Sequence, residues 1–200
     1  MKSLPFLFLW SVLAGRFLLC LAVAETQPVV HDPSVHAGAG LKKELIAGIT
    51  EADFLKLGPK PKTLNITLVT AFTEANSGMN FNGYSHGGAT YTVPVGWTIQ
   101  VTFINPSPVP HSAIVVEREI LKRPQMGDPI FEGASTPAPV TGMSTSKTSF
   151  TFIATDPGEY AFACGIPTHA SAGHWVKFDV SAKASKPTLQ LGDAPAKEAR

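Results

Sequence analysis

One stretch near the carboxyl end decides the fold and chemistry of this chain: Cys164-Gly165-Ile166-Pro167-Thr168-His169-Ala170-Ser171-Ala172-Gly173-His174. It holds a thiol and two imidazoles, and Pro167 and Gly173 keep it from forming one regular helix. We therefore expect a loop between two strands. A thiolate is a soft ligand and an imidazole a borderline one, so together they suit copper, zinc or iron rather than magnesium or calcium.

Cysteine usage supports a metal site. The chain has two cysteines, and the other one, Cys20, lies in an apolar amino-terminal segment with the features of a removable leader. Without that segment, Cys164 has no intramolecular disulfide partner. Metal ligation is the natural explanation of a lone thiol in an exported protein.

Residues 1–24 have the pattern of an export signal. A long apolar run ends in Ala22-Val23-Ala24, an A-x-A cleavage pattern just before Glu25. Residues 4–24 also approach the ~20 residues of a membrane-spanning helix, with Arg16 as the one charge. A cleaved signal peptide and an uncleaved membrane anchor therefore both stay open. Either one predicts a periplasmic or other extracytoplasmic location.

Composition favours one all-β domain. The chain has 200 residues, of which 44% are hydrophobic, enough for one real core. It contains 17 glycines and 17 prolines, and long helical periodicity is missing. Removal of the leader takes away Lys2 and Arg16 and leaves 14 basic against 15 acidic residues. With no basic stripe, a nucleic acid is not expected as a partner.

The sequence divides into an extension, a β domain and a tail. Residues 25–62 are predicted to form a linker with short helical turns, and Thr50 to Asp53 resembles a capping box. Residues 63–181 contain seven or eight short segments of period two, which predicts a sandwich or a barrel. Residues 182–200 are rich in Ala, Lys and Pro, and a disordered tail is predicted there.

Strand parity directs the candidate ligands inward. Cys164 continues the apolar face of the strand before the loop, and His174 begins the apolar face of the strand after it. His111 opens a β-branched strand whose two faces are both apolar, so its direction is less defined. His169 hangs from the loop. A thiol and imidazoles turned toward an apolar interior are what a small, dry metal site requires.

These residues give the chain a resemblance to the cupredoxin family, and most of all to the sulfocyanin group. The matching segments, within about residues 64–181, are Asn80-Phe81-Asn82-Gly83, Val95-Gly96-Trp97, Val101-Thr102-Phe103, Pro110-His111, Pro157-Gly158-Glu159-Tyr160 and Cys164-Gly165-Ile166-Pro167-x-His169. The resemblance implies a Greek-key β-sandwich holding one type 1 copper per chain. It also implies that His111, Cys164 and His169 are equatorial ligands.

The chain departs from the family pattern at two positions. His174 stands where members usually carry an axial Met, and His174 is expected as a fourth ligand that lowers the reduction potential and moves the absorption band away from blue. Ser112 stands where an Asn commonly ties the ligand loops together. A shorter side chain is expected to do so less well.

The function predicted from this resemblance is a single-electron shuttle rather than an enzyme. Its implied partners are respiratory redox proteins, such as a cytochrome or a terminal oxidase. Two alternatives stay open: a single-copper enzyme or nitric oxide site with perturbed coordination, and a copper-delivery protein. For the carrier, we expect an apolar docking collar beside His169 made of Ile166, Pro167, Ala170 and Ala172.

Overall fold

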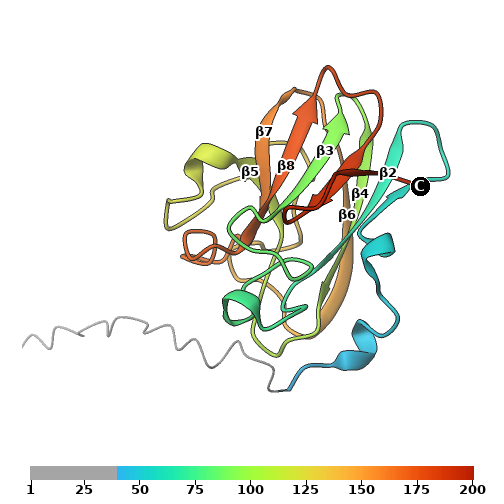
Figure 1. Cartoon of the computed structure of the whole chain (residues 1–200). Coiled ribbons are helices and arrows are strands. Elements are labelled where there is room, and N and C mark those ends of the chain that lie inside the picture. The colour runs from blue at the N-terminus through green and yellow to red at the C-terminus, as the bar shows by residue number, and fades with distance from the viewer. Residues whose placement is uncertain (1–39) are drawn as a thin grey trace, which may run out of the picture. The chain divides into compact units, whose positions relative to one another are not determined.

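The computed structural model describes residues 40–200, so the predicted leader or anchor at residues 1–24 lies outside the described residues. Within residues 40–200, no helix is long and apolar enough to cross a membrane. Strands dominate this part of the chain, with short 3-10 helices between them (Figure 1). The elements are η2 (Lys43–Leu45), η3 (Glu51–Asp53), β1 (Leu55–Leu57), β2 (Thr63–Val69), η4 (Ala75–Gly78), β3 (Ala89–Pro94), β4 (Thr98–Asn105), β5 (Ile114–Glu117), η5 (Arg118–Ile120), β6 (Ser146–Ile153), β7 (Gly158–Ala163), β8 (Trp175–Ser181), β9 (Thr188–Leu191) and β10 (Lys197–Glu198).

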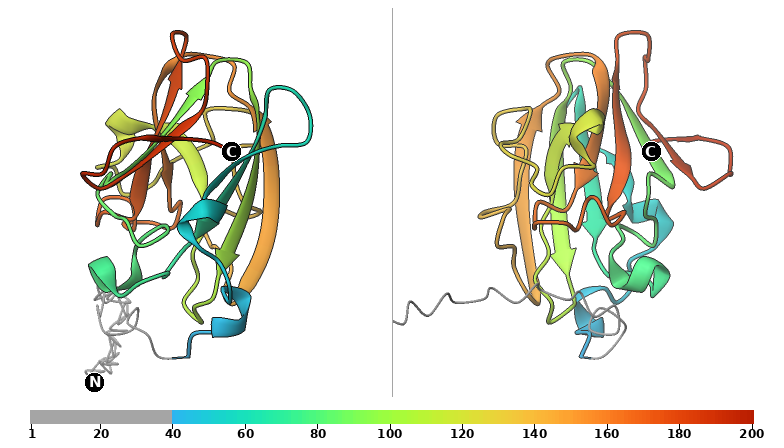
Figure 2. Two further views of the ribbon diagram at one scale, coloured as in Figure 1. Left: turned by 45° about the vertical axis from the view of Figure 1, so that its right-hand side comes forward. Right: turned by 90° about the vertical axis from the view of Figure 1, so that its left-hand side faces the viewer.

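The strands form two sheets that face each other across one hydrophobic core (Figure 2). One sheet has the order β1-β2-β4-β6, and the other has the order β10-β9-β3-β8-β7-β5. Both sheets are mixed, because β2 pairs with β4, and β3 with β8, in parallel. The predicted all-β sandwich is confirmed. The capping box predicted before η3 is also present, with Thr50 and Asp53 bonded to each other.

Period-two alternation is what builds the core. Along β2 and β4 the alternate apolar side chains are buried, while their neighbours reach the outer face of the sheet. The ring of Phe162 on β7 packs against Phe178 on β8 with a centroid distance of 4.7 Å. The inward side chains of the first sheet include Leu64, Ile66, Leu68, Ile99, Val101 and Phe103, each at most 1% exposed.

Strand β5 is buried on both faces up to its last residue, the exposed Glu117, which explains why the rest of its sequence is apolar. Val115 joins the main core between the sheets, whereas Ile114 and Val116 belong to a second cluster. Leu121 and Met126, from the long connection after η5, are part of that second cluster. This connection covers the outer side of β5 and lets a strand at a sheet edge carry no polar face.

The prediction of a disordered tail at residues 182–200 is wrong for the segment that forms β9 and β10. Strand β9 pairs antiparallel with β3 and extends the second sheet, and Leu189 on it is 7% exposed. The Leu57 amide donates to the Arg200 carbonyl at 2.9 Å, so the last residue is held against β1. Composition suggested disorder, but backbone pairing with an existing sheet edge requires only a short alternating stretch.

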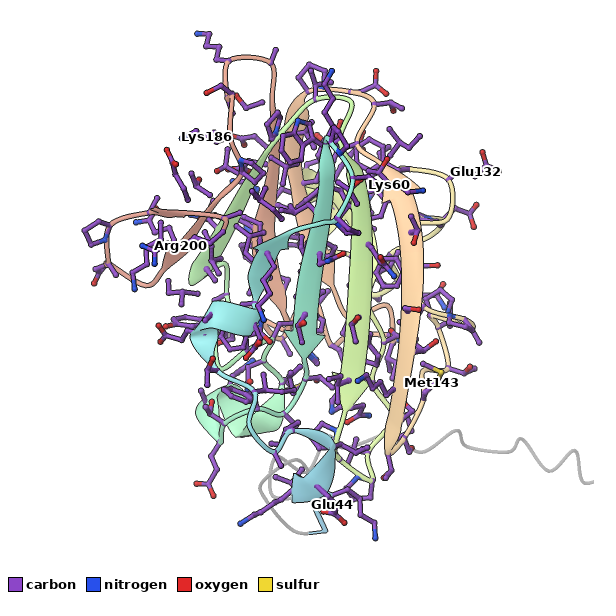
Figure 3. The ribbon with its side chains drawn as sticks, turned by 90° about the vertical axis from the view of Figure 1, so that its right-hand side faces the viewer. Glu44, Lys60, Glu132, Met143, Lys186 and Arg200 are labelled. Atoms are coloured by element: carbon purple, nitrogen blue, oxygen red, sulfur yellow. The ribbon has the colours of Figure 1, made fainter. Side chains whose placement is uncertain are left out.

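The loops at one end of the sandwich carry the candidate ligands. Figure 3 shows Met143 near one end of the β1-β2-β4-β6 sheet and Lys60 near the other. The main chains of Met143 and His111 are paired by two hydrogen bonds of 3.2 and 2.9 Å. The end marked by Met143, called the ligand end below, is therefore the end where His111 lies.

Candidate metal centre

Four side chains with metal-binding atoms converge at the ligand end. His111, Cys164, His169 and His174 each offer one donor atom, and these atoms all lie within 4.8 Å of one another. Three of the side chains are 0% exposed, and His169 is 3% exposed. The structure thus brings together all four residues selected from the sequence, in surroundings that exclude bulk water.

The loop between β7 and β8 supplies three of the donors. Cys164 follows β7 directly and His174 precedes β8, and the Cys164 amide donates to the His174 carbonyl at 3.0 Å. The loop then turns back, because the His174 amide donates to the His169 carbonyl at 3.0 Å. The Cys164 Sγ atom and the His169 Nδ1 atom are 3.4 Å apart. Two neighbouring strands of one sheet therefore set the spacing of these donors.

The fourth donor comes from the connection between β4 and β5. His111 precedes β5, which pairs with β7, so it reaches the same end of the sheet as Cys164. The His111 ring centroid lies 5.3 Å from that of His169 and 4.9 Å from that of His174. The three imidazoles form one contiguous group around the thiol.

Gly173 allows the loop to turn just before His174. Its φ is +96°, a conformation that side-chain-bearing residues rarely adopt. A Cβ atom there would also lie 2.1 to 2.4 Å from atoms of the His86 ring. His86 is exposed and is not among the clustered donors, but its amide donates to the Gly173 carbonyl at 2.8 Å. His31 and His36 lie outside the described residues.

Ser112 holds the ligand loops together, contrary to the weak link expected of a short side chain. Its hydroxyl donates to the Pro139 carbonyl at 2.7 Å and accepts the Gly165 amide at 2.9 Å. The same oxygen lies 3.7 Å from the Cys164 Sγ atom. The serine suffices because the chain around Pro139 comes close enough to accept its proton.

Burial controls the protonation of the thiol. The apolar surroundings raise the pKa of Cys164, and contacts with the backbone of Ile166 and with Ser112 only partly oppose this effect. Without a bound metal, the thiol is therefore expected to be protonated at neutral pH. A metal that binds the thiolate must displace that proton, so binding is expected to weaken as the pH falls.

Two further residues contact the cluster and were missed by the sequence analysis. The Thr70 hydroxyl lies 3.1 Å from the His174 Nε2 atom, and the Phe81 ring centroid lies 4.5 Å from that of His174. Phe81 belongs to one of the matching segments, which was a usable signal. Thr70 gave none, because 104 residues separate it from His174.

Comparison with known proteins agrees with this geometry. Residues 50–190 match the family model described as the sulfocyanin (SoxE) domain. The chain belongs to this family. The sulfocyanin of Sulfolobus acidocaldarius is 26% identical over an alignment of 137 residues, which covers 63% of this chain and 67% of that protein. The resemblance to cupredoxins of the sulfocyanin group is thereby confirmed. The match runs beyond residues 63–181 at both ends, and the sheets do so too, through β1 and β9.

Solved structures of cupredoxins are also similar to the sulfocyanin domain. Rusticyanin from Thiobacillus ferrooxidans is 21% identical, with a TM-score of 0.44 over 65% of this chain and 89% of that chain. An auracyanin from Roseiflexus castenholzii is 23% identical, with a TM-score of 0.40 over 58% of this chain and 96% of that chain.

The donor set fits the cofactor of the family. Cupredoxins bind one type 1 copper, and a thiolate with neighbouring imidazoles is a donor set for this ion. Donors that share one such ion at about 2.0 to 2.3 Å lie at most ~4.6 Å from each other. The four donor atoms lie within 4.8 Å of one another, close to this limit, and their types suit a copper site.

Proposed function

We propose that this protein is an exported mononuclear copper protein that carries single electrons between respiratory redox proteins. His111, Cys164 and His169 are the equatorial ligands, and His174 is the axial ligand. The observation that supports this proposal best is the convergence of these four donors in one buried cluster. Copper, when bound there, supplies the one-electron couple.

The burial of the cluster favours the carrier over the alternatives. A copper-delivery protein needs donors that a partner can reach, and an enzyme needs an open position for its substrate. Here the most exposed donor, His169, is only 3% exposed. A closed site with fixed donors suits outer-sphere electron transfer, in which no ligand enters or leaves.

His169 is the most suitable port for the electron, since it is the donor nearest the surface. Of the collar proposed around it, Ile166 and Pro167 are half-buried and Ala172 is exposed. Ala170 does not contribute, because it is 2% exposed and packs in the second apolar cluster. The remaining apolar surface is small, which suits the brief contact of a carrier with a cytochrome or terminal oxidase.

The extracytoplasmic location and an attachment to the membrane through residues 4–24 are part of the same proposal. They follow from the leader pattern in the sequence. Fractionation of cells, with mass measurement of the purified protein, distinguishes a cleaved leader from a retained anchor.

A spectroscopic and metal analysis of the copper-loaded protein tests the proposed site. We expect about one copper per chain and an intense thiolate charge-transfer band that Cys164→Ser abolishes. We further expect His174→Met to move this band toward blue and to raise the reduction potential, because a thioether binds Cu(II) more weakly than an imidazole. His86→Met is the control and is expected to change neither property.

Stoichiometric zinc without a charge-transfer band would contradict the carrier. If His174→Met changed neither the absorption spectrum nor the reduction potential, His174 would not be a ligand, and the other three donors would remain as the proposed ligands. Rapid oxidation of the reduced protein by oxygen or nitrite, or rapid reaction with nitric oxide, without a partner would favour the enzyme instead.

A further inference from the structure

A buried hydrogen bond links the proposed axial ligand to the other sheet of the sandwich. The Thr70 Oγ1 atom lies 3.1 Å from the His174 Nε2 atom, and both residues are 0% exposed. Thr70 follows β2, a strand of the β1-β2-β4-β6 sheet, whereas His174 precedes β8 in the opposite sheet. The contact therefore bridges the sandwich next to the cluster.

The main chain holds Thr70 firmly in this place. Its amide donates to the Ile104 carbonyl at 3.0 Å, which continues the parallel pairing of β2 with β4. Thr70 also forms an isolated bridge with Phe81, whose ring packs on the imidazole of His174 with a centroid distance of 4.5 Å. A hydroxyl on such a rigid support fixes the direction of the ring that it contacts.

The direction of this hydrogen bond decides which nitrogen of His174 can serve as a ligand. If Nε2 carries the proton and donates to Thr70, then Nδ1 presents its lone pair to a metal. If the hydroxyl donates to Nε2, then Nδ1 of the neutral ring carries the proton and cannot ligate. A ligating Nδ1 therefore requires that Thr70 accept the proton of Nε2.

We propose that Thr70 is a positioning residue for His174: by accepting the Nε2 proton, it selects the tautomer whose Nδ1 lone pair is available to a metal. This inference rests on the proposed function, because it assumes that His174 ligates. It adds that the imidazole at the position of the family's usual axial Met has a hydrogen-bond acceptor, the Thr70 hydroxyl, in the opposite sheet.

The test compares Thr70→Val, which is nearly isosteric and has no hydroxyl, with Thr70→Ser, which keeps it. In metal-free protein, we expect ¹⁵N NMR to find His174 as the Nε2-protonated tautomer in the wild type and in Thr70→Ser. Thr70→Val should lose this preference. In the copper-loaded protein, we expect Thr70→Val to lower copper affinity by about 10- to 100-fold and to change the copper hyperfine coupling in the paramagnetic resonance spectrum. Thr70→Ser should restore both properties.

Two outcomes would overturn the role of Thr70. One is a His174 tautomer that is unchanged by Thr70→Val, and the other is a copper spectrum that changes equally in Thr70→Ser and Thr70→Val. If the proposed function is wrong in making His174 a ligand, a different result is expected. His174→Ala would then leave the copper spectrum as in the wild type, even though the NMR arm still detected the tautomer preference set by Thr70.

Discussion

At the scale of single residues, the backbone of each of the four donors is held by a main-chain hydrogen bond. The amides of His111, Cys164, His169 and His174 donate to the carbonyls of Met143, His174, Ile166 and His169 at distances of 3.0 to 3.2 Å. Only the side-chain torsions of the donors then remain to be set. Contacts such as those of Ser112 with the thiol and Thr70 with His174 restrict these torsions further. A site fixed in this way changes little between oxidation states, as an electron carrier requires.

Ser112 gives the sharpest test of this arrangement. Ser112→Ala leaves the buried Gly165 amide and the Pro139 carbonyl without the hydroxyl that joins them, so we expect a loss of about 1 to 3 kcal/mol in the free energy of unfolding. The copper charge-transfer band should also shift, because the hydroxyl no longer faces the Cys164 sulfur. Urea denaturation and absorption spectra measure the two effects. Ser144→Ala, at an exposed serine of the connection that contains Pro139, should show neither. Equal behaviour of the two variants would contradict the role given to Ser112.

Sequence reasoning reached the donors but not the residues that hold them. Cys164 and His174 flank strands of clear alternation, so parity alone directed them inward. The partners of Ser112 lie 27 and 53 residues away, and Thr70 is 104 residues from His174. Such contacts arise from the way the two sheets stack, and no local pattern reports them.

At the scale of elements, the alternation of apolar and polar residues predicted the longer strands. It missed short strands that form only by pairing with the edge of an existing strand. Leu64 to Leu68 and Ile99 to Phe103 show a regular period of two, and both segments form central strands. Strands β1 and β10 have only three and two residues. Segments this short have no stability of their own, and they exist because β2 and β9 offer a free edge.

The capping box of η3, next to β1, contains a carboxylate whose contribution to stability should depend on pH. The pKa of Asp53 is lowered from 3.8 to about 2, chiefly by Lys56 at 2.6 Å and then by the backbone and hydroxyl of Thr50. Because the folded-state pKa is the lower one, the contribution of the carboxylate to stability is present above pH 3.8 and is lost as the pH falls through about 2.

An NMR titration of the Asp53 carboxyl carbon checks this prediction. The midpoint should lie near pH 2 in the wild type and move toward 3.8 in Lys56→Met, which removes the main cause of the shift. Lys60→Met, a change at the other side of β1, is the control and should leave the midpoint in place. A wild-type midpoint near 3.8 would mean that the capping contacts do not persist in solution.

At the scale of the whole molecule, formal charges are absent from the chain segments next to the donors and lie farther out at the ligand end, as Glu44 does in Figure 3. Four segments approach the cluster there: residues 75–92, 105–116, 134–146 and 163–176. None of them contains Asp, Glu, Lys or Arg, although the chain has 31 such residues. We therefore expect a partner that docks directly over the donors to be recognised mainly by shape and apolar contact.

This distribution of charge predicts that electron transfer through the ligand end depends only weakly on salt. Rates of oxidation by small cationic and anionic reagents should change by less than about twofold between low salt and ~0.5 M salt, since the nearest formal charges, such as exposed Arg123 beside Pro124, lie outside the segments that surround the donors. Val140→Lys, which places a charge at this end, should make the rates salt-dependent with opposite signs for the two reagents. Leu57→Lys is a matched control, because both side chains are 47% exposed and Leu57 pairs with Leu64 at the start of β2, toward the Lys60 end. If both lysine variants acquire the same salt dependence, the electron does not leave through the ligand end, and His169 is not the port.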